Sequence, residues 1–166
     1  MGAEQFFPDE EYSTRLRRLR ECMREKAFDV LLVSSPENIF YLTGLSHQGH
    51  FAYQMLLVPI EEEMILITRA MEKVVVEDQV LPRARWFGFA DHEDPARFTV
   101  KILEKEGFEK ARLGIEKDHM FLPPKIAEGI INGFHKALWK DASGIVEELR
   151  MVKSPREILY IRELQE

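Results

Sequence analysis

The sequence predicts an α/β domain of three layers, with a mixed, mostly parallel sheet of about six strands and helices on both faces. Short apolar runs rich in branched residues alternate with stretches in which apolar residues recur every three or four positions, the pattern of alternating strands and helices. Two of the runs, 54–59 and 64–68, are separated only by residues 60–63. That hairpin-length connection predicts antiparallel pairing, whereas a helical pattern separates each later run from the one before it and favours parallel pairing.

The first predicted element is an amphipathic helix over about residues 10–26, because Tyr12, Leu16, Leu19 and Met23 recur at helical intervals. Its other face carries arginines interleaved with glutamates. We interpret that face as solvated rather than as a nucleic-acid patch. The arginines concerned are Arg15, Arg17, Arg18, Arg20 and Arg24.

Six strands and three further helices follow in order. The expected strands are 29–33, 54–59, 64–68, 85–89, 111–115 and 137–140. Ser35 and Pro36 form the cap and first position of a short helix that ends near Gly44. Asp94 caps a helix that ends at Gly107, and the proline pair 123–124 opens another.

The C-terminal residues predict a helix for which the sequence offers no C-terminal cap. Ser154 suits the N-cap, Pro155 the first position, and Glu157 completes a capping box. An apolar stripe follows, formed by Ile158, Ile161 and Leu164. We therefore expect the chain to be cut at a domain junction. Residues 1–153 would form the first domain, and residues 154–166 would begin the helix that leads into a domain absent from this chain.

Composition narrows the classes of partner. The chain has 166 residues, is 45% hydrophobic and carries a net charge of -6, which fits one globular domain and disfavours nucleic acid and anionic lipid. No apolar run spans a membrane, and the N-terminus lacks a basic region followed by an apolar one, so we expect a cytoplasmic protein. Cys22 is the single cysteine, which excludes an internal disulfide and a cysteine-based zinc site.

The sharpest local cluster of chemical groups is His47-Gln48-Gly49-His50. We find no glycine-rich phosphate loop, no Gly-x-Ser-x-Gly elbow and no His-Glu-x-x-His motif. Two histidines make half of a transition-metal site, so the pattern favours loop histidines bonded to backbone or water, with a substrate or interface role as the alternative. His119 and His135 are isolated in the sequence and indicate surface or satisfied core residues.

Two segments at opposite ends of the chain resemble motifs of one enzyme family. Asn38-Ile39-Phe40-Tyr41-Leu42-Thr43-Gly44 resembles the Asn-Ile-x-Tyr-Leu-Thr-Gly segment in the amino-terminal domain of creatinase, prolidase and Xaa-Pro aminopeptidase, the "pita-bread" metallohydrolases. Residues 149–162 resemble the Leu-Arg-x-Ile-Lys-Ser-x-x-Glu-Ile-x-x-Ile-Arg junction that leads into the catalytic domain of these enzymes. In both segments the matching residues are structural, including Asn38, Ser154 and Glu157.

This resemblance implies a non-catalytic domain of ribonuclease H-like topology. A pair of divalent metals, such as Mn, Co or Zn, is expected on two aspartates, one histidine and two glutamates of the absent catalytic domain, so no catalytic or metal-binding residue is assigned here. Expected partners are a second copy in a homodimer, the chain's own C-terminal catalytic domain, and a proline-containing peptide or small polar substrate. The loop 45–53 is expected to reach the partner subunit's pocket, with His47, His50, Phe51 and Tyr53 as candidates.

Three alternatives remain open at this point. One is a stand-alone interaction module that kept the fold and lost the catalytic half. Another is the N-terminal domain of a creatinase-type hydrolase that acts on a small non-peptide compound. A nuclease is disfavoured, because the expected strands carry almost no carboxylates to hold a metal and the net charge opposes a polyanionic substrate.

Overall fold

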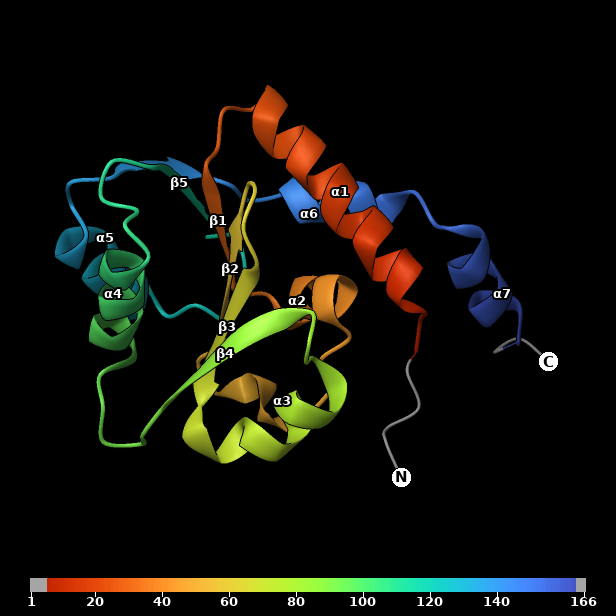
Figure 1. Ribbon diagram of the computed structural model, residues 1–166, viewed down its shortest axis with the longest axis horizontal. Helices are drawn as coiled ribbons and strands as arrows, with labels where there is room; N and C mark the ends of the chain where they lie inside the picture. Colours follow the sequence, from red (N-terminus) through yellow and green to blue (C-terminus); the bar gives the residue numbers. More distant parts are fainter. Residues whose placement is uncertain (1–5, 164–166) are drawn as a thin grey trace.

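The computed structural model describes residues 6–163, except for the side chain of His50. Within that range one sheet of six strands carries helices on both faces, which confirms the predicted three-layer α/β class (Figure 1). The strands are β1 (Val30–Val33), β2 (Met55–Pro59), β3 (Met64–Arg69), β4 (Ala84–Phe89), β5 (Arg112–Ile115) and β6 (Leu138–Asp141).

The helices follow the predicted order, with short ones added. They are α1 (Asp9–Glu25), α2 (Pro36–Thr43), η1 (Gln48–Phe51), η2 (Ala70–Glu72), α3 (Lys73–Gln79), α4 (Pro95–Lys105), α5 (Pro124–Gly133), α6 (Ile145–Met151) and α7 (Pro155–Glu163). Among them α3, α6, η1 and η2 have three to seven residues each, too few for a clear helical period in the sequence. Leu164, the third residue of the predicted C-terminal stripe, lies outside the described residues.

The sheet has the order β4-β3-β2-β1-β5-β6. β2 runs antiparallel to both of its neighbours, β1 and β3, whereas β1·β5, β3·β4 and β5·β6 pair in parallel. The hairpin predicted from the short connection is therefore β2–β3, and the sheet is mixed and mostly parallel. No helix within residues 6–163 is long and apolar enough to cross a bilayer.

Two apolar cores lie on the two faces of the sheet, because successive side chains of a strand point to opposite sides. In β1, Leu31 and Val33 pack under α1, α2, α3 and α6, while Val30 and Leu32 pack under α4 and α5. A buried strand between two helical layers must be apolar at every position, which explains its uninterrupted Val-Leu-Leu-Val sequence.

Gly114 allows close packing where β5 pairs with β1. A Cβ atom at this position would lie 2.6 Å from Leu31 Cδ2 and 2.8 Å from the Cβ atom of Ala142. The register places Gly114 opposite Leu31, and the aromatic ring of Phe28 closes the same space. A side chain at residue 114 would therefore collide with the core beneath α1 and α6.

Candidate functional site

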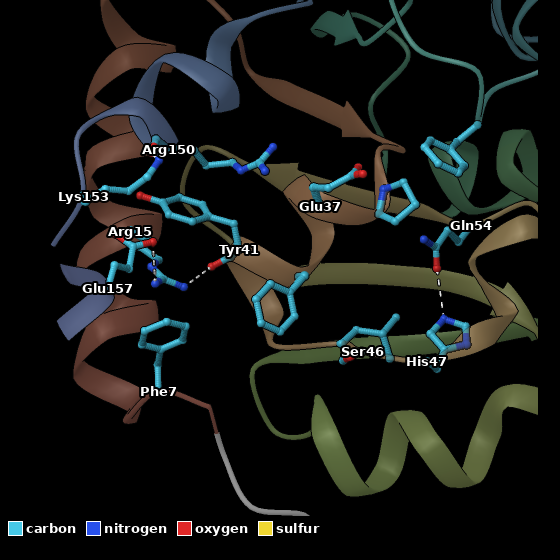
Figure 2. Close-up of a pocket in the computed structure, with 14 residues that line it drawn as sticks. Phe7, Arg15, Glu37, Tyr41, Ser46, His47, Gln54, Arg150, Lys153 and Glu157 are labelled. Carbon is cyan, nitrogen blue, oxygen red and sulfur yellow. Dashed lines mark hydrogen bonds and ion pairs between the residues drawn. The ribbon is translucent and has the colours of Figure 1, made fainter. Parts of the chain in front are cut away.

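A pocket of about 490 Å³ opens between α2, the loop that follows it, and the junction of α6 with α7 (Figure 2). Aromatic rings and charged side chains share its wall. Of the residues singled out in the sequence, Tyr41, His47 and Glu157 line this pocket, whereas Phe51 and Tyr53 do not. The structure thus brings the two family-like segments, far apart in the sequence, to one place.

Asn38 is the centre of a buried hydrogen-bond network under α2. Its side chain is fully buried, and its Nδ2 group donates to Glu116 Oε1 and Glu147 Oε1, each at 2.6 Å. Its Oδ1 atom accepts from Arg150 Nη1 at 2.8 Å. A side-chain amide supplies both donors and an acceptor, so it can join two carboxylates and a guanidinium in one small space.

Glu116 follows β5 directly and is 2% exposed. Its Oε2 atom accepts from the backbone N–H groups of Ser34 and Ser35 at 2.9 and 3.0 Å, at the start of α2. His119 Nε2 lies 3.3 Å from the same oxygen, and its hydrogen bond to this carboxylate raises the pKa of His119. His119, which is isolated in the sequence, is therefore the third hydrogen-bond partner of Glu116 Oε2. Nothing in the sequence indicated the buried carboxylate of Glu116.

The Asn-Ile-x-Tyr-Leu-Thr-Gly segment forms α2 and its C-terminal cap. Tyr41 and Leu42 are buried against the sheet, and Thr43 Oγ1 donates to the carbonyl of Ile39 at 2.7 Å. Gly44 adopts a left-handed φ of 81°, which ends the helix. A Cβ atom there would also meet the hydroxyl of Tyr12 at 2.5 Å, so both conformation and space require glycine.

Arg15 corrects the prediction of a solvated arginine face on α1. The residue is 2% exposed, and its guanidinium lies 4.2 Å from the ring centre of Phe7 and 4.3 Å from that of Tyr41. It donates to the Tyr41 carbonyl at 2.8 Å and pairs with Glu157 of α7 at 3.1 Å and with Glu11 at 3.4 Å. Stacking on aromatic faces and ion pairing together make this burial stable.

α7 starts with the predicted capping box. The backbone N–H of Glu157 donates to Ser154 Oγ at 3.1 Å, and the backbone N–H of Ser154 donates to Glu157 Oε2 at 2.7 Å. Pro155 occupies the first helical position. Tyr160 then donates its hydroxyl to the carbonyl of Phe6, although no residue of the described helix is buried.

The loop 45–53 is held from inside by polar side chains. His47 Nδ1 accepts from the backbone N–H of Gly49 at 3.0 Å, and His47 Nε2 lies 3.2 Å from Gln54 Oε1. Glu72 Oε2 lies 3.1 Å from the same Nδ1 atom. These contacts hold the His47 side chain, 8% exposed, against its own domain in the lining of the pocket (Figure 2).

Of the other candidates in the loop, Phe51 is exposed and Tyr53 is buried. Phe51 is 84% exposed on η1. Tyr53 is buried, and its hydroxyl lies 2.7 Å from Thr99 Oγ1 of α4. Burial raises the pKa of this phenol. Tyr53 is therefore not available at the surface to a partner subunit, while the side chain of His50 lies outside the described residues.

The described side chains form no cluster with metal-site geometry. Leaving residues 1–5, 164–166 and the His50 side chain aside, no group of three or more histidine, cysteine, aspartate or glutamate side chains is arranged to hold a metal ion. Glu116 and Glu147 both accept from Asn38, and Glu116 also accepts from the start of α2 and pairs with His119. The lining of the neighbouring pocket combines aromatic rings with cations, among them Phe7, Phe40, Arg15 and Arg150.

The class of domain is defined by the sheet order with its antiparallel central strand β2, by the capped α2 and by the capped α7 that follows α6. The chain belongs to the creatinase/prolidase N-terminal domain family, whose model matches residues 15–152. Among curated relatives, an uncharacterised hydrolase/peptidase of Sinorhizobium fredii is 27% identical over 95% of this chain, and the ectoine hydrolase of Halomonas elongata is 28% identical over 94%.

A solved structure agrees with this assignment. The dipeptidase of Pyrococcus horikoshii matches 87% of this chain and 38% of its own, with a TM-score of 0.70 and 28% identity. The chain spans 42% and 41% of the two curated relatives, about two fifths of their length.

Proposed function

We propose that this chain is the non-catalytic N-terminal domain of a metal-dependent hydrolase of the Xaa-Pro dipeptidase or aminopeptidase type. The support is the family, the peptidase names among its relatives, and the two fifths of their length that it spans. In this proposal residues 1–153 form the domain and 154–166 begin the helix that leads into a catalytic domain. That second domain would carry the divalent metal pair, and the whole protein would be a cytoplasmic homodimer.

The role of the domain would be to pair two subunits and to shape the substrate pocket of the partner with the loop 45–53. The observation that carries this proposal is the exposure of Phe51, 84%, in a loop whose interior contains the hydrogen bonds of His47 to Gly49 and Gln54. A loop held this firmly presents an apolar ring at low entropic cost, which is a property of binding surfaces. His47 then acts by fixing the loop's shape, while Phe51 makes contact.

A second candidate substrate class is favoured by one comparison. The ectoine hydrolase of Halomonas elongata, named for a small non-peptide compound, is 28% identical to this chain. The parent enzyme would then open a small polar molecule rather than a peptide bond before proline. A stand-alone interaction module is the third possibility, and it requires the coding frame to stop after Glu166.

The test uses the protein encoded by the complete gene, with Phe51→Ala compared with Met120→Ala. Both residues are 84% exposed, and Met120 lies outside the loop, so the pair is matched in burial. We expect Phe51→Ala to raise KM by about three- to tenfold, the effect of about 1 kcal/mol of lost contact, with metal content unchanged.

Three results would contradict the proposal. Equal kinetics of the two variants would mean that Phe51 does not contribute to the partner's substrate pocket. A monomer in light scattering, at the concentration used for the assay, would exclude the role across subunits. A stop codon after Glu166 would remove the enzyme altogether, whereas hydrolysis of ectoine but not of Xaa-Pro dipeptides would select the second candidate.

A further inference from the structure

The pocket beside α2 has one basic end and an aromatic wall. Figure 2 shows Arg150 and Lys153 on one side, with Glu37 next to them, and His47 on the opposite side. Phe40 adds an aromatic ring to the lining of the same pocket. This distribution is that of a site for a molecule with one charged end and an apolar body.

Within residues 6–163, neither of the two cations at the basic end has a carboxylate within ion-pair distance, and Arg150 interacts with Glu37 only at longer range. Arg150 donates through Nη1 to the amide oxygen of Asn38, at 2.8 Å, and Lys153 donates to the backbone carbonyl of Arg150. Both acceptors are uncharged, and no ion pair joins either cation to a described carboxylate. Since a guanidinium has five donors and an ammonium three, each retains donors for a ligand.

The third cation of the wall does not contribute to this basic end. Arg15 is already paired with Glu157 and Glu11 and bonded to a backbone carbonyl. Glu37 is the remaining carboxylate there, and its Oε2 atom accepts from the Ser35 hydroxyl at 2.8 Å. The charge balance at this end is therefore two positive groups against one negative group, which suits a single negative charge and disfavours two.

We propose that this pocket binds a small organic monocarboxylate with an aromatic or similarly flat apolar body. The carboxylate lies between Arg150 and Lys153, where a guanidinium and an ammonium both donate to it. The apolar body lies against the ring of Phe40. The pocket volume of about 490 Å³ falls within the range of small-molecule sites, roughly 300–1,000 Å³.

Such a ligand would contact both α2 and the segment between α6 and α7. Phe40 belongs to α2, whereas Lys153 lies between α6 and α7. Because no described residue of α7 is buried, its position depends on a few polar and ring contacts. A bound carboxylate adds one more contact at this junction, and amide exchange in residues 155–163 becomes slower.

The test titrates 3-phenylpropionate into the 166-residue chain and follows binding by calorimetry and amide exchange, with the uncharged 3-phenylpropanamide as the matched ligand. Lys153→Gln should weaken binding of the carboxylate and Glu37→Gln should strengthen it, each by about three- to fivefold, the effect of one partly exposed charge. Both residues are exposed, so neither change disturbs the core. Lys136→Gln, at an exposed lysine outside the pocket lining, should change nothing.

The two opposite charge changes keep the proposal falsifiable. Equal affinity for the amide and the carboxylate would overturn it, as would shifts in the same direction for Lys153→Gln and Glu37→Gln. An absence of binding at millimolar ligand would also overturn it. None of these outcomes depends on a catalytic assay, so the proposal stands or fails separately from the hydrolase function.

Discussion

Replacing Arg15 by methionine tests whether one buried cation holds α7 on the domain. The Arg15 side chain is 3% exposed, stacks on the rings of Phe7 and Tyr41, and pairs with Glu157. The substitution therefore leaves the carboxylate of Glu157, which is 16% exposed, without its buried cation. Removing one member of a buried ion pair costs about 3–5 kcal/mol, and desolvated cation–π contacts contribute about 1–2 kcal/mol more. Methionine recovers some packing, and Glu157 regains some hydration.

We therefore expect Arg15→Met to lower the free energy of unfolding by about 3 kcal/mol in urea at neutral pH. Arg17→Met on the same helix is the matched control, because its partner Glu21 and its own side chain are both more than half exposed. That change should cost no more than about 0.5 kcal/mol. In hydrogen exchange, the amides of α7 should lose protection in Arg15→Met and keep it in Arg17→Met.

Two results would refute this reasoning. A similar loss of stability in the two variants would mean that burial of the Arg15 guanidinium contributes nothing beyond a surface charge. Unchanged protection of α7 in a destabilised Arg15→Met protein would mean that Glu157 is not held by this cation. The urea m-value must stay constant for the comparison to report stability alone.

Two further predictions concern the core and the pH dependence of stability. Gly114→Ala should lower the free energy of unfolding by about 1–3 kcal/mol, because the new methyl group meets the immobile Cβ atom of Ala142. Urea denaturation measures this loss, and a variant with wild-type stability would contradict the packing argument. His119 has a raised pKa in the folded state because its imidazolium hydrogen-bonds to Glu116, so its stabilising contribution is complete below the unfolded pKa of about 6.5 and is lost as pH rises through the folded pKa. The difference in unfolding free energy between the wild type and His119→Gln should accordingly be largest in mild acid and shrink toward alkaline pH; a difference that grows with pH would contradict it.

The sequence predicted the frame of the fold because that information is local. Caps at Ser35, Asp94 and Ser154 and the left-handed Gly44 each depend on neighbours within one helical turn, and each is present in the structure. The apolar runs predicted strands since a strand buried on both faces has an uninterrupted apolar sequence.

The network under α2 could not be predicted, because it depends on distant partners. Asn38 was identified as structural, but its partners Glu116, Glu147 and Arg150 are 78, 109 and 112 residues away in the chain. No periodicity connects such positions. Only the fold places the residue that follows β5 beside the start of α2.

Arg15 was missed even though a local signal existed. The buried positions of α1 are Tyr12, Arg15, Leu19 and Met23, which are spaced at three, four and four residues. The sequence predicts Leu16 in the apolar stripe and Arg15 on the solvated face, because glutamates are interleaved with the arginines of this helix. Helical spacing admits both residues between Tyr12 and Leu19, and Leu16 does pack against the core.

The contacts that hold α7 join the two ends of the described chain, and this has a consequence for the order of folding. Tyr160 and Phe6 are 154 residues apart, and Arg15 and Glu157 are 142 apart, whereas β1, β2 and β3 follow one another closely. Closing so long a loop is entropically costly until the intervening chain is compact. During synthesis, α1 and its arginine therefore emerge well before α7, so the contacts of Arg15 and Phe6 with α7 form only after most of the sheet has been made.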